Sequence, residues 1–155
     1  MSIKKFTDIK RDKKIEVPQN IIQESIPDIQ TSACSKLFSK LFESREMAQI
    51  YNLQINEDSG STSQIALNEY HDSVLELIDQ LIETWQGQYN IVEGYDIINT
   101  KNTESKDKIE YFKELAEFIK VERKCISEDD SHLQKKVDEI VTLVYKTLYK
   151  LRFNK

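Results

Sequence analysis

Scarcity of chain-breaking residues is the feature that most constrains what this sequence can fold into. Its 155 residues include three glycines and two prolines. All-β domains need many tight turns, in which glycine and proline are the usual residues. So few of them favour long helices joined by a small number of connections. A chain of this length can bury a substantial core as one domain, and we predict a single all-α domain.

Composition indicates a soluble protein without a membrane partner. Charged residues make up 32% and hydrophobic residues 39% of the chain, a balance typical of globular domains. No apolar run approaches the roughly 18 residues of a membrane span, and the first residues lack the apolar segment of a signal peptide. Cys34 and Cys125 have no CxxC partner. We expect two free thiols in a reducing compartment, rather than a disulfide or a metal site.

Hydrophobic spacing and capping residues predict a four-helix bundle at 31–155 behind an N-terminal arm at 1–30. The helices are expected at about 32–56, 63–86, 105–126 and 131–153. Ser32 and Ser105 are suitable N-caps, and Gly87 is a typical residue after a helix end. Pro18 and Pro27 disfavour helix in the residue before them. Residues 1–30 are therefore either a disordered tail or an extended arm that lies on a partner.

Connection lengths predict the order of the helices. Short loops join the first helix to the second and the third to the fourth, so each of these pairs should be antiparallel. The connection at 88–104 can reach about 60 Å when extended, whereas a helix of this size is about 36 Å long. It can therefore cross the whole bundle and place the second and third helices parallel. This is the single-crossover topology of ferritin-like bundles.

The second predicted helix carries a row of carboxylates opposite its apolar face. Spacings of three and four residues place these acids on one side: Glu69, Asp72, Glu76, Asp79 and Glu83. No Lys or Arg occurs between residues 46 and 100, so nothing nearby offsets their repulsion. The row is a solvated face, a docking surface for a basic partner, or a site for hard cations between subunits. We predict a partner-binding acidic face.

Polar residues interrupt the apolar faces of the first and third predicted helices. They are Arg45, Gln49 and Asn52 on the first helix and Glu122 on the third. Burial of such groups costs several kcal/mol unless they are paired. We predict a buried polar cluster in which Arg45 meets Glu122 or another inward carboxylate. The alternative is a slightly rotated first helix that leaves Arg45 at the surface.

Several segments of the first two predicted helices resemble a known family. They are Ser39–Gln54, Gly60, Ala66–Asp72, Leu77–Asp79 and Glu83–Gly87. Over residues 36–95 the chain is similar to a family of tailed-phage proteins of unassigned function. The bundle of that family resembles the ferritin-like and Dps-like (starvation DNA-protection) proteins. This resemblance implies a phage virion component, located in the virion or the host cytoplasm.

Ferritin-like proteins hold iron between histidines and carboxylates of facing helices. This chain has the amides Gln49, Asn52 and Gln64 where imidazoles would be expected, and amides are poor iron ligands. We therefore predict no catalytic residue, no cofactor and no metal site, with residual ferroxidase-like activity as the one enzymatic alternative. In that alternative, iron would bind between subunits at Asp72, Asp79 and Glu83.

The leading functional prediction is a non-enzymatic structural or interaction protein, whose partners are other protein chains in a homo-oligomer or a larger virion assembly. Met47, Ile50 and Tyr51 support it, because they add apolar surface outside the core arc of the first helix. The alternative is a Dps-like metal-binding and DNA-binding oligomer. Its nucleic-acid contact would be the basic residues of the arm, Lys4, Lys5, Lys10, Arg11, Lys13 and Lys14, which resemble the basic tails of such proteins.

Overall fold

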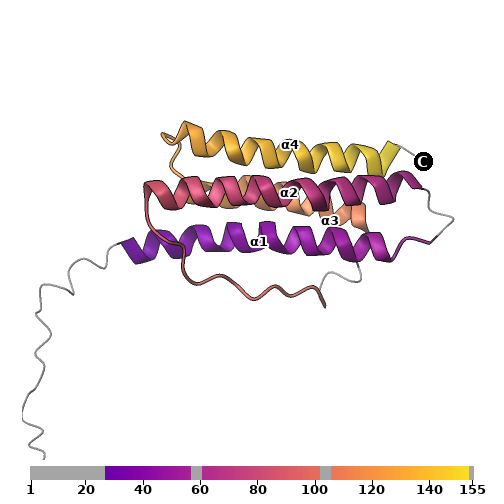
Figure 1. Cartoon of the computed structure of the whole chain (residues 1–155), viewed down its shortest axis with the longest axis horizontal. Coiled ribbons are helices and arrows are strands. Elements are labelled where there is room, and N and C mark those ends of the chain that lie inside the picture. The colour runs from indigo at the N-terminus through magenta and orange to yellow at the C-terminus, as the bar shows by residue number, and fades with distance from the viewer. Residues whose placement is uncertain (1–26, 57–60, 102–105, 154–155) are drawn as a thin grey trace, which may run out of the picture.

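In the described part of the chain, the computed structural model contains four long helices packed side by side (Figure 1). It describes residues 27–56, 61–101 and 106–153, with only the backbone described for 27–33. The helices are α1 (Pro27–Leu53), α2 (Ser61–Gln88), α3 (Lys108–Glu122) and α4 (Ser131–Phe153), and the short 3-10 helix η5 (Arg123–Cys125) continues α3. The described segments contain no strand, so the predicted all-α bundle is confirmed. None of these helices is long and apolar enough to cross a membrane.

Helix order follows from the connection between α2 and α3. Residues 89–101 run along α1 from one end of the bundle toward the other, so that α3 starts near the end where α2 started (Figure 1). Helices α2 and α3 therefore run in the same direction, as the connection length predicts. Helix α2 packs against α1 and α4, and α3 packs against the same two helices, each time antiparallel. The likeness of this arrangement to ferritin-like proteins stays a prediction.

The core is rich in aromatic rings that join different helices. Phe38 of α1 meets Trp85 of α2 edge-on, with ring centroids 6.0 Å apart. Tyr70 of α2 meets the ring of Phe112 in α3 at 4.9 Å. Helix α4 contributes an aliphatic face whose residues recur at helical spacing: Leu133, Val137, Ile140, Val144, Leu148 and Leu151 are all buried.

A hydrogen bond inside this core also ties α1 to α2. The Ser44 hydroxyl lies 2.6 Å from the carbonyl oxygen of Leu41, and the Tyr70 hydroxyl lies 2.7 Å from Ser44 Oγ. Since Ser44 donates to the carbonyl, Tyr70 is the donor to Ser44. Both buried hydroxyls thus have partners, which avoids the cost of an unsatisfied polar group. Burial raises the pKa of Tyr70 well above its ordinary value.

The start of α1 differs from the sequence prediction. The helix begins at Pro27 rather than near residue 32, and so includes residues 27–30 of the predicted arm. Proline is accepted in the first turn because N–H groups there have no partner within the helix. The rest of the predicted arm, residues 1–26, lies outside the described residues, as does the predicted cap Ser105.

The end of α2 also differs, because Gly87 does not stop the helix. The N–H group of Tyr89 still donates to the Trp85 carbonyl oxygen at 2.9 Å. The Gln88 amide donates to Asp130 Oδ1 at 2.8 Å, and the Tyr89 hydroxyl donates to the other carboxylate oxygen. These contacts with the start of α4 hold the last turn of α2 in place.

Helix α3, in contrast, is shorter than the predicted 105–126, because its end tightens into η5.

A disulfide bond joins Cys34 of α1 to Cys125 of η5, so the prediction of two free thiols is wrong. Their Cα atoms are 5.3 Å apart, a usual separation for a disulfide. The cysteines are 91 residues apart in the sequence. They meet because α1 and α3 are antiparallel, which brings the start of α1 to the end of α3. The bond therefore closes one end of the bundle.

We expect Cys125→Ser to lower the free energy of unfolding by about 2–4 kcal/mol, because the unfolded chain is no longer restricted by the cross-link. Urea unfolding followed by circular dichroism measures the loss. A reductant should lower the stability of the unaltered chain to a similar value and leave the variant unchanged. If the reductant has no effect on the unaltered chain, the disulfide does not form in solution.

We also expect the bundle to lose stability above about pH 10, because buried tyrosines have raised pKa values. Burial raises the pKa of Tyr51 to about 12, and burial together with Glu43 raises that of Tyr111 further. Tyrosines of the unfolded chain release their protons near pH 10. Above that pH the unfolded state therefore binds fewer protons than the folded state, and stability falls as the pH rises. Below it, the contribution of these groups is complete.

Tyr70→Phe tests this dependence directly. Removal of one buried phenol should make the alkaline loss of stability less steep, by up to about 1.4 kcal/mol per pH unit. Urea titrations between about pH 8 and pH 11 compare the two chains. An equal slope in both would mean that Tyr70 ionises without unfolding.

Candidate functional site

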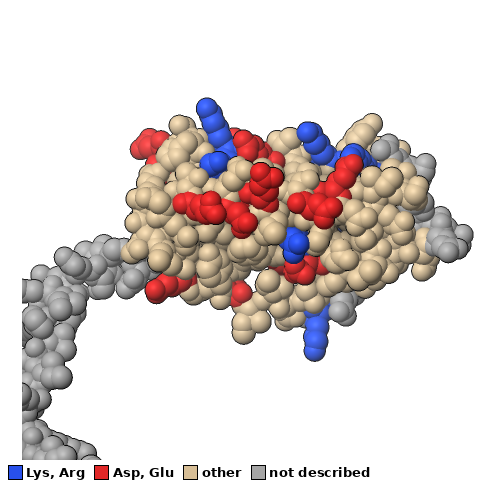
Figure 2. Space-filling view, viewed as in Figure 1, with Lys and Arg blue, Asp and Glu red and all other residues tan. Residues whose placement is uncertain are grey.

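The outer face of α2 carries the predicted acidic row, and all five carboxylates are exposed. Figure 2 shows acidic side chains gathered across the middle of the molecule, over α2. Lys150 of α4 pairs with Glu69 at one end of the row. Among the described residues, no Lys or Arg pairs with the other four acids, Asp72, Glu76, Asp79 and Glu83. We call the five carboxylate residues of this row the acidic face.

The acidic face does not form a metal site within one chain. Nowhere in the described segments do three His, Cys, Asp or Glu side chains come together as a metal ion would require. His71 Nδ1 lies 3.0 Å from Asp72 Oδ1, and this pair stands by itself. An iron site that uses Asp72, Asp79 and Glu83 would therefore need ligands from another chain.

The predicted buried cluster of Arg45, Gln49, Asn52 and Glu122 does not form. Glu122 pairs instead with Lys36 at 2.7 Å. Arg45 follows Lys36 by nine residues, which is about 13.5 Å along the helix, and is too far from Glu122. Arg45 pairs with Glu46 at 2.9 Å, and its side chain is 27% exposed. The alternative of a rotated helix is thus closer to the observed position of Arg45.

The two amides of that predicted cluster are also only half-buried. Asn52 donates to the side-chain oxygen of Asn68 in α2 at 2.9 Å, so it joins the two helices at their edge. Two buried atoms, Arg45 Nε and Asn52 Oδ1, have no hydrogen-bond partner among the described residues. The sequence shows that polar residues interrupt the apolar face of α1. It does not show which residues of other helices lie beside them, because the periodicity of one helix carries no such information.

Extra apolar surface on α1 is not observed at Met47 and Tyr51, which are both buried. The ring of Tyr51 packs against Tyr111 of α3 with centroids 5.6 Å apart. Ile50 is half-buried against the same core. Helix α3 thus covers the side of α1 that was expected to be exposed. The prediction that this side is a contact surface for other chains is wrong.

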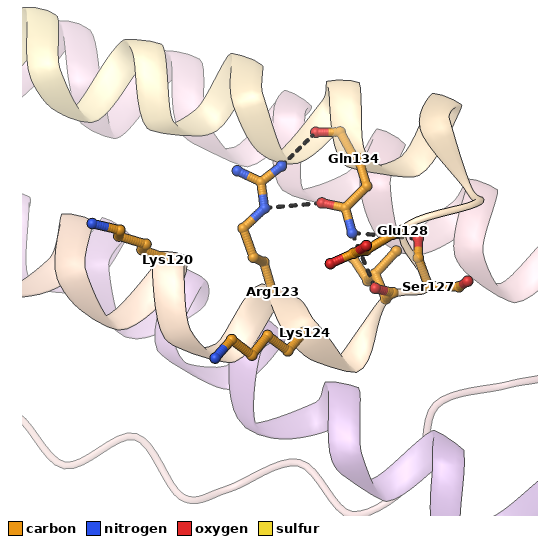
Figure 3. Close-up of a pocket in the computed structure, with 7 residues that line it drawn as sticks. Lys120, Arg123, Lys124, Ser127, Glu128 and Gln134 are labelled. Carbon is orange, nitrogen blue, oxygen red and sulfur yellow. Dashed lines mark hydrogen bonds between the residues drawn. The ribbon is translucent and has the colours of Figure 1, made fainter.

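The turn from η5 to α4 borders a hollow of about 480 Å³ with a basic lining. Figure 3 shows Arg123 reaching from η5 toward Gln134 of α4. Its Nε donates to Gln134 Oε1 at 2.9 Å, and its guanidinium lies 2.8 Å from the Asp138 carboxylate. The Gln134 amide in turn donates to the Ile126 carbonyl oxygen at 3.0 Å. These bonds hold the turn, so Arg123 and Gln134 have a structural role.

Two lysines beside this hollow have a simple explanation too. Lys120 and Lys124 lie in the last turn of α3 and in η5. Cations at this position complement the partial negative charge of a helix C-terminus. The hollow therefore needs no bound ligand to account for its basic lining.

The outer face of α4 exposes aromatic rings that were not predicted to form a site. Tyr145, Tyr149 and Phe153, spaced four residues apart, are 52%, 59% and 60% exposed. The rings of Tyr149 and Phe153 lie 5.4 Å apart, and the Arg152 guanidinium lies 4.8 Å from the centroid of Phe153. A shallow hollow of about 440 Å³ runs between Thr142 and Lys150. The four-residue spacing, outside the arc of the aliphatic core, was the signal that could have identified this face.

The acidic face adjoins this surface, which we call the aromatic face: Tyr145, Lys146, Tyr149, Lys150, Arg152 and Phe153. The ion pair between Lys150 and Glu69 crosses the boundary between the two. Residues 142–153 include three cations and no acid, whereas α2 includes five acids and no Lys or Arg. Figure 2 shows basic side chains at the upper edge of the molecule, where α4 lies, and others near its centre and lower edge. Bands of opposite charge therefore lie side by side on one region of the surface.

Comparison with known proteins identifies a family without a known function. The model of a family of unknown function, DUF5856, matches residues 61–151, from the first residue of α2 almost to the end of α4. The match includes the whole acidic face and most of the aromatic face, and it leaves out α1. No curated protein and no solved structure matches the chain.

Neutralising one residue of the acidic face should stabilise the fold. Asp79 lies three residues from Glu76 and four from Glu83, so Asp79→Asn removes two repulsive pairs. We expect a gain of about 0.5 kcal/mol in the free energy of unfolding at low salt, and a smaller gain at high salt. Urea unfolding at the two ionic strengths measures it.

Glu117→Gln on α3 is a matched control with the opposite expected sign. Glu117 is exposed like Asp79, but it lies between Lys113 and Lys120 at helical spacing. Its neutralisation should therefore lower stability slightly. Equal effects of the two substitutions would contradict an electrostatic cost of the acidic face.

Proposed function

The chain belongs to DUF5856, a family of unknown function, and we propose that it is a non-enzymatic structural or interaction protein. The observation that carries this proposal is the aromatic face of α4, where three aromatic side chains are more than half exposed. Tyr, Phe and Arg are enriched where proteins contact one another, because they bury a large area, and Tyr and Arg also offer polar groups. The partners would be other protein chains.

The polar groups with the most contacts support the same interpretation. Tyr70 and Ser44 bond to each other in the core, and Arg123 and Gln134 hold the turn before α4. Each of these groups is used to fix one helix against another. The acidic and aromatic faces are exposed, and their charged and aromatic side chains are open to a partner.

The assembly that we propose is a phage virion, in which this protein is a structural component. Support comes from the resemblance of residues 36–95 to tailed-phage proteins. A disulfide is also found more often on virions than in reduced cytoplasm, which favours the virion over the host cytoplasm as its final location. The basic arm would tie the chain to a neighbour.

A Dps-like metal-binding and DNA-binding oligomer is the second candidate, and the helix order supports it. A bundle with parallel α2 and α3 and antiparallel neighbours is the arrangement that ferritin-like proteins use. The acidic face would supply carboxylate oxygens for iron at a contact between chains. The six basic residues between Lys4 and Lys14 would supply contacts to DNA phosphates.

If the protein is a virion component, particles that are banded repeatedly in a density gradient should keep it in a fixed ratio to the main capsid protein. Quantitative mass spectrometry of successive bands measures that ratio. Tyr149→Lys should reduce incorporation several-fold, because it replaces an exposed ring by a cation at the proposed contact. Val121→Lys on α3, at a residue that is 56% exposed, is the control and should be incorporated normally. Loss of the unaltered protein on rebanding would contradict the proposal.

The Dps-like candidate makes two different predictions. The purified chain should retain iron after aerobic loading with iron(II), measured by elemental analysis. It should also bind duplex DNA more weakly as salt rises, and deletion of residues 1–14 should abolish that binding. A chain that retains no iron, and whose DNA binding does not depend on these residues, would rule this candidate out.

A further inference from the structure

The acidic face of α2 and the aromatic face of α4 are complementary to each other, and we propose that a second copy of this chain binds across both in a two-fold dimer. This inference rests on the proposed function, because it names the partner of the surface from which that function was inferred.

Charge selects a second copy over other partners. A polyanion would be attracted by Lys146, Lys150 and Arg152, but the acidic face beside them would repel it. A uniformly basic partner would be repelled by α4 in the same way. The partner must present both signs, in bands that lie in the opposite order. A second copy turned by 180° presents that pattern, because its α4 faces the first chain's α2.

The register between α2 and α4 shows which residues would meet. Lys150 pairs with Glu69 near one end, and Gln88 bonds to Asp130 near the other, so the heights of the two helices along the bundle are fixed. Lys146, one turn before Lys150, therefore lies at a height between those of Asp72 and Glu76. Among the described residues, no Lys or Arg pairs with these two acids within the chain, and Asp72 pairs only with His71.

A two-fold axis parallel to the helices leaves these heights unchanged. Lys146 of one copy would then face Asp72 and Glu76 of the partner copy, and the same contact would repeat on the other side of the axis. Phe153 lies near the height of Ile65, which is 53% exposed. Phe153 of one copy and Ile65 of the other copy would therefore form an apolar contact at the end of the interface. The α2 and α4 helices of both copies would form a second four-helix arrangement, again with antiparallel neighbours.

The test is the molar mass of the full-length chain in solution, measured by sedimentation equilibrium at several concentrations and two salt concentrations. We expect a dimer that weakens as salt rises. Lys146→Glu should raise the dimer dissociation constant by about tenfold or more, because it places like charges opposite each other. Glu76→Lys should have a similar effect. Lys124→Glu, the same change at an exposed residue of η5, is the matched control and should leave the constant unchanged.

The double variant Lys146→Glu with Glu76→Lys is the decisive measurement. Each reversed residue would face a reversed partner across the axis, so dimerisation should return to within a few-fold of the unaltered chain. A general loss of folding would not be rescued in this way, and the circular dichroism of each variant checks that the helices are intact.

Two outcomes would overturn the inference: a monomer at every concentration, or a dimer that neither single variant weakens. The fate of the proposed function is separate. A monomer that still bands with virions would overturn the dimer and leave the proposed function standing. A dimer that is lost from the particles would overturn the proposed function and leave the dimer standing.

Discussion

Burial of the apolar face of α2 is the constraint on which the rest of the structure depends. This helix packs against both α1 and α4, and its Tyr70 also reaches the ring of Phe112 in α3. Once that face is turned inward, the carboxylates on the opposite side of α2 must face outward. Repulsion within the row is the consequence, and it is small beside the free energy gained from burial of Tyr70 and Trp85. The acidic face is therefore compatible with folding without contributing to it.

The long connection from α2 to α3 has consequences at both ends of the bundle. It makes α1 and α3 antiparallel, which brings Cys34 to Cys125 and Lys36 to Glu122 at one end. At the other end the same arrangement packs Tyr51 against Tyr111. A hairpin of two consecutive helices, α1 with α2 or α3 with α4, would offer neither contact. The disulfide thus reinforces a chain order that helix packing has already determined.

Two groups of polar side chains in this protein have different roles. Those between helices, such as Ser44, Tyr70 and Gln134, have hydrogen-bond partners within the bundle and fix its geometry. Those on the outer faces of α2 and α4 have few partners and lie in adjacent bands of opposite charge. The second group is exposed, and so it is available to another molecule. This division is why binding, rather than chemistry, is the function that we propose.

The sequence by itself determined the four helices, the core face of α4 and the outward position of the acidic row. These features depend on residues within one helix, so the periodicity of a single segment is enough to predict them. The length of the connection also predicted the parallel run of α2 and α3, because chain reach is a local property. Only the tertiary structure decided that Gly87 stays helical, that Arg45 pairs with Glu46, and that Cys34 meets Cys125. In each of these cases the outcome depends on which distant segments pack together, and the spacing of residues along one helix does not contain that information.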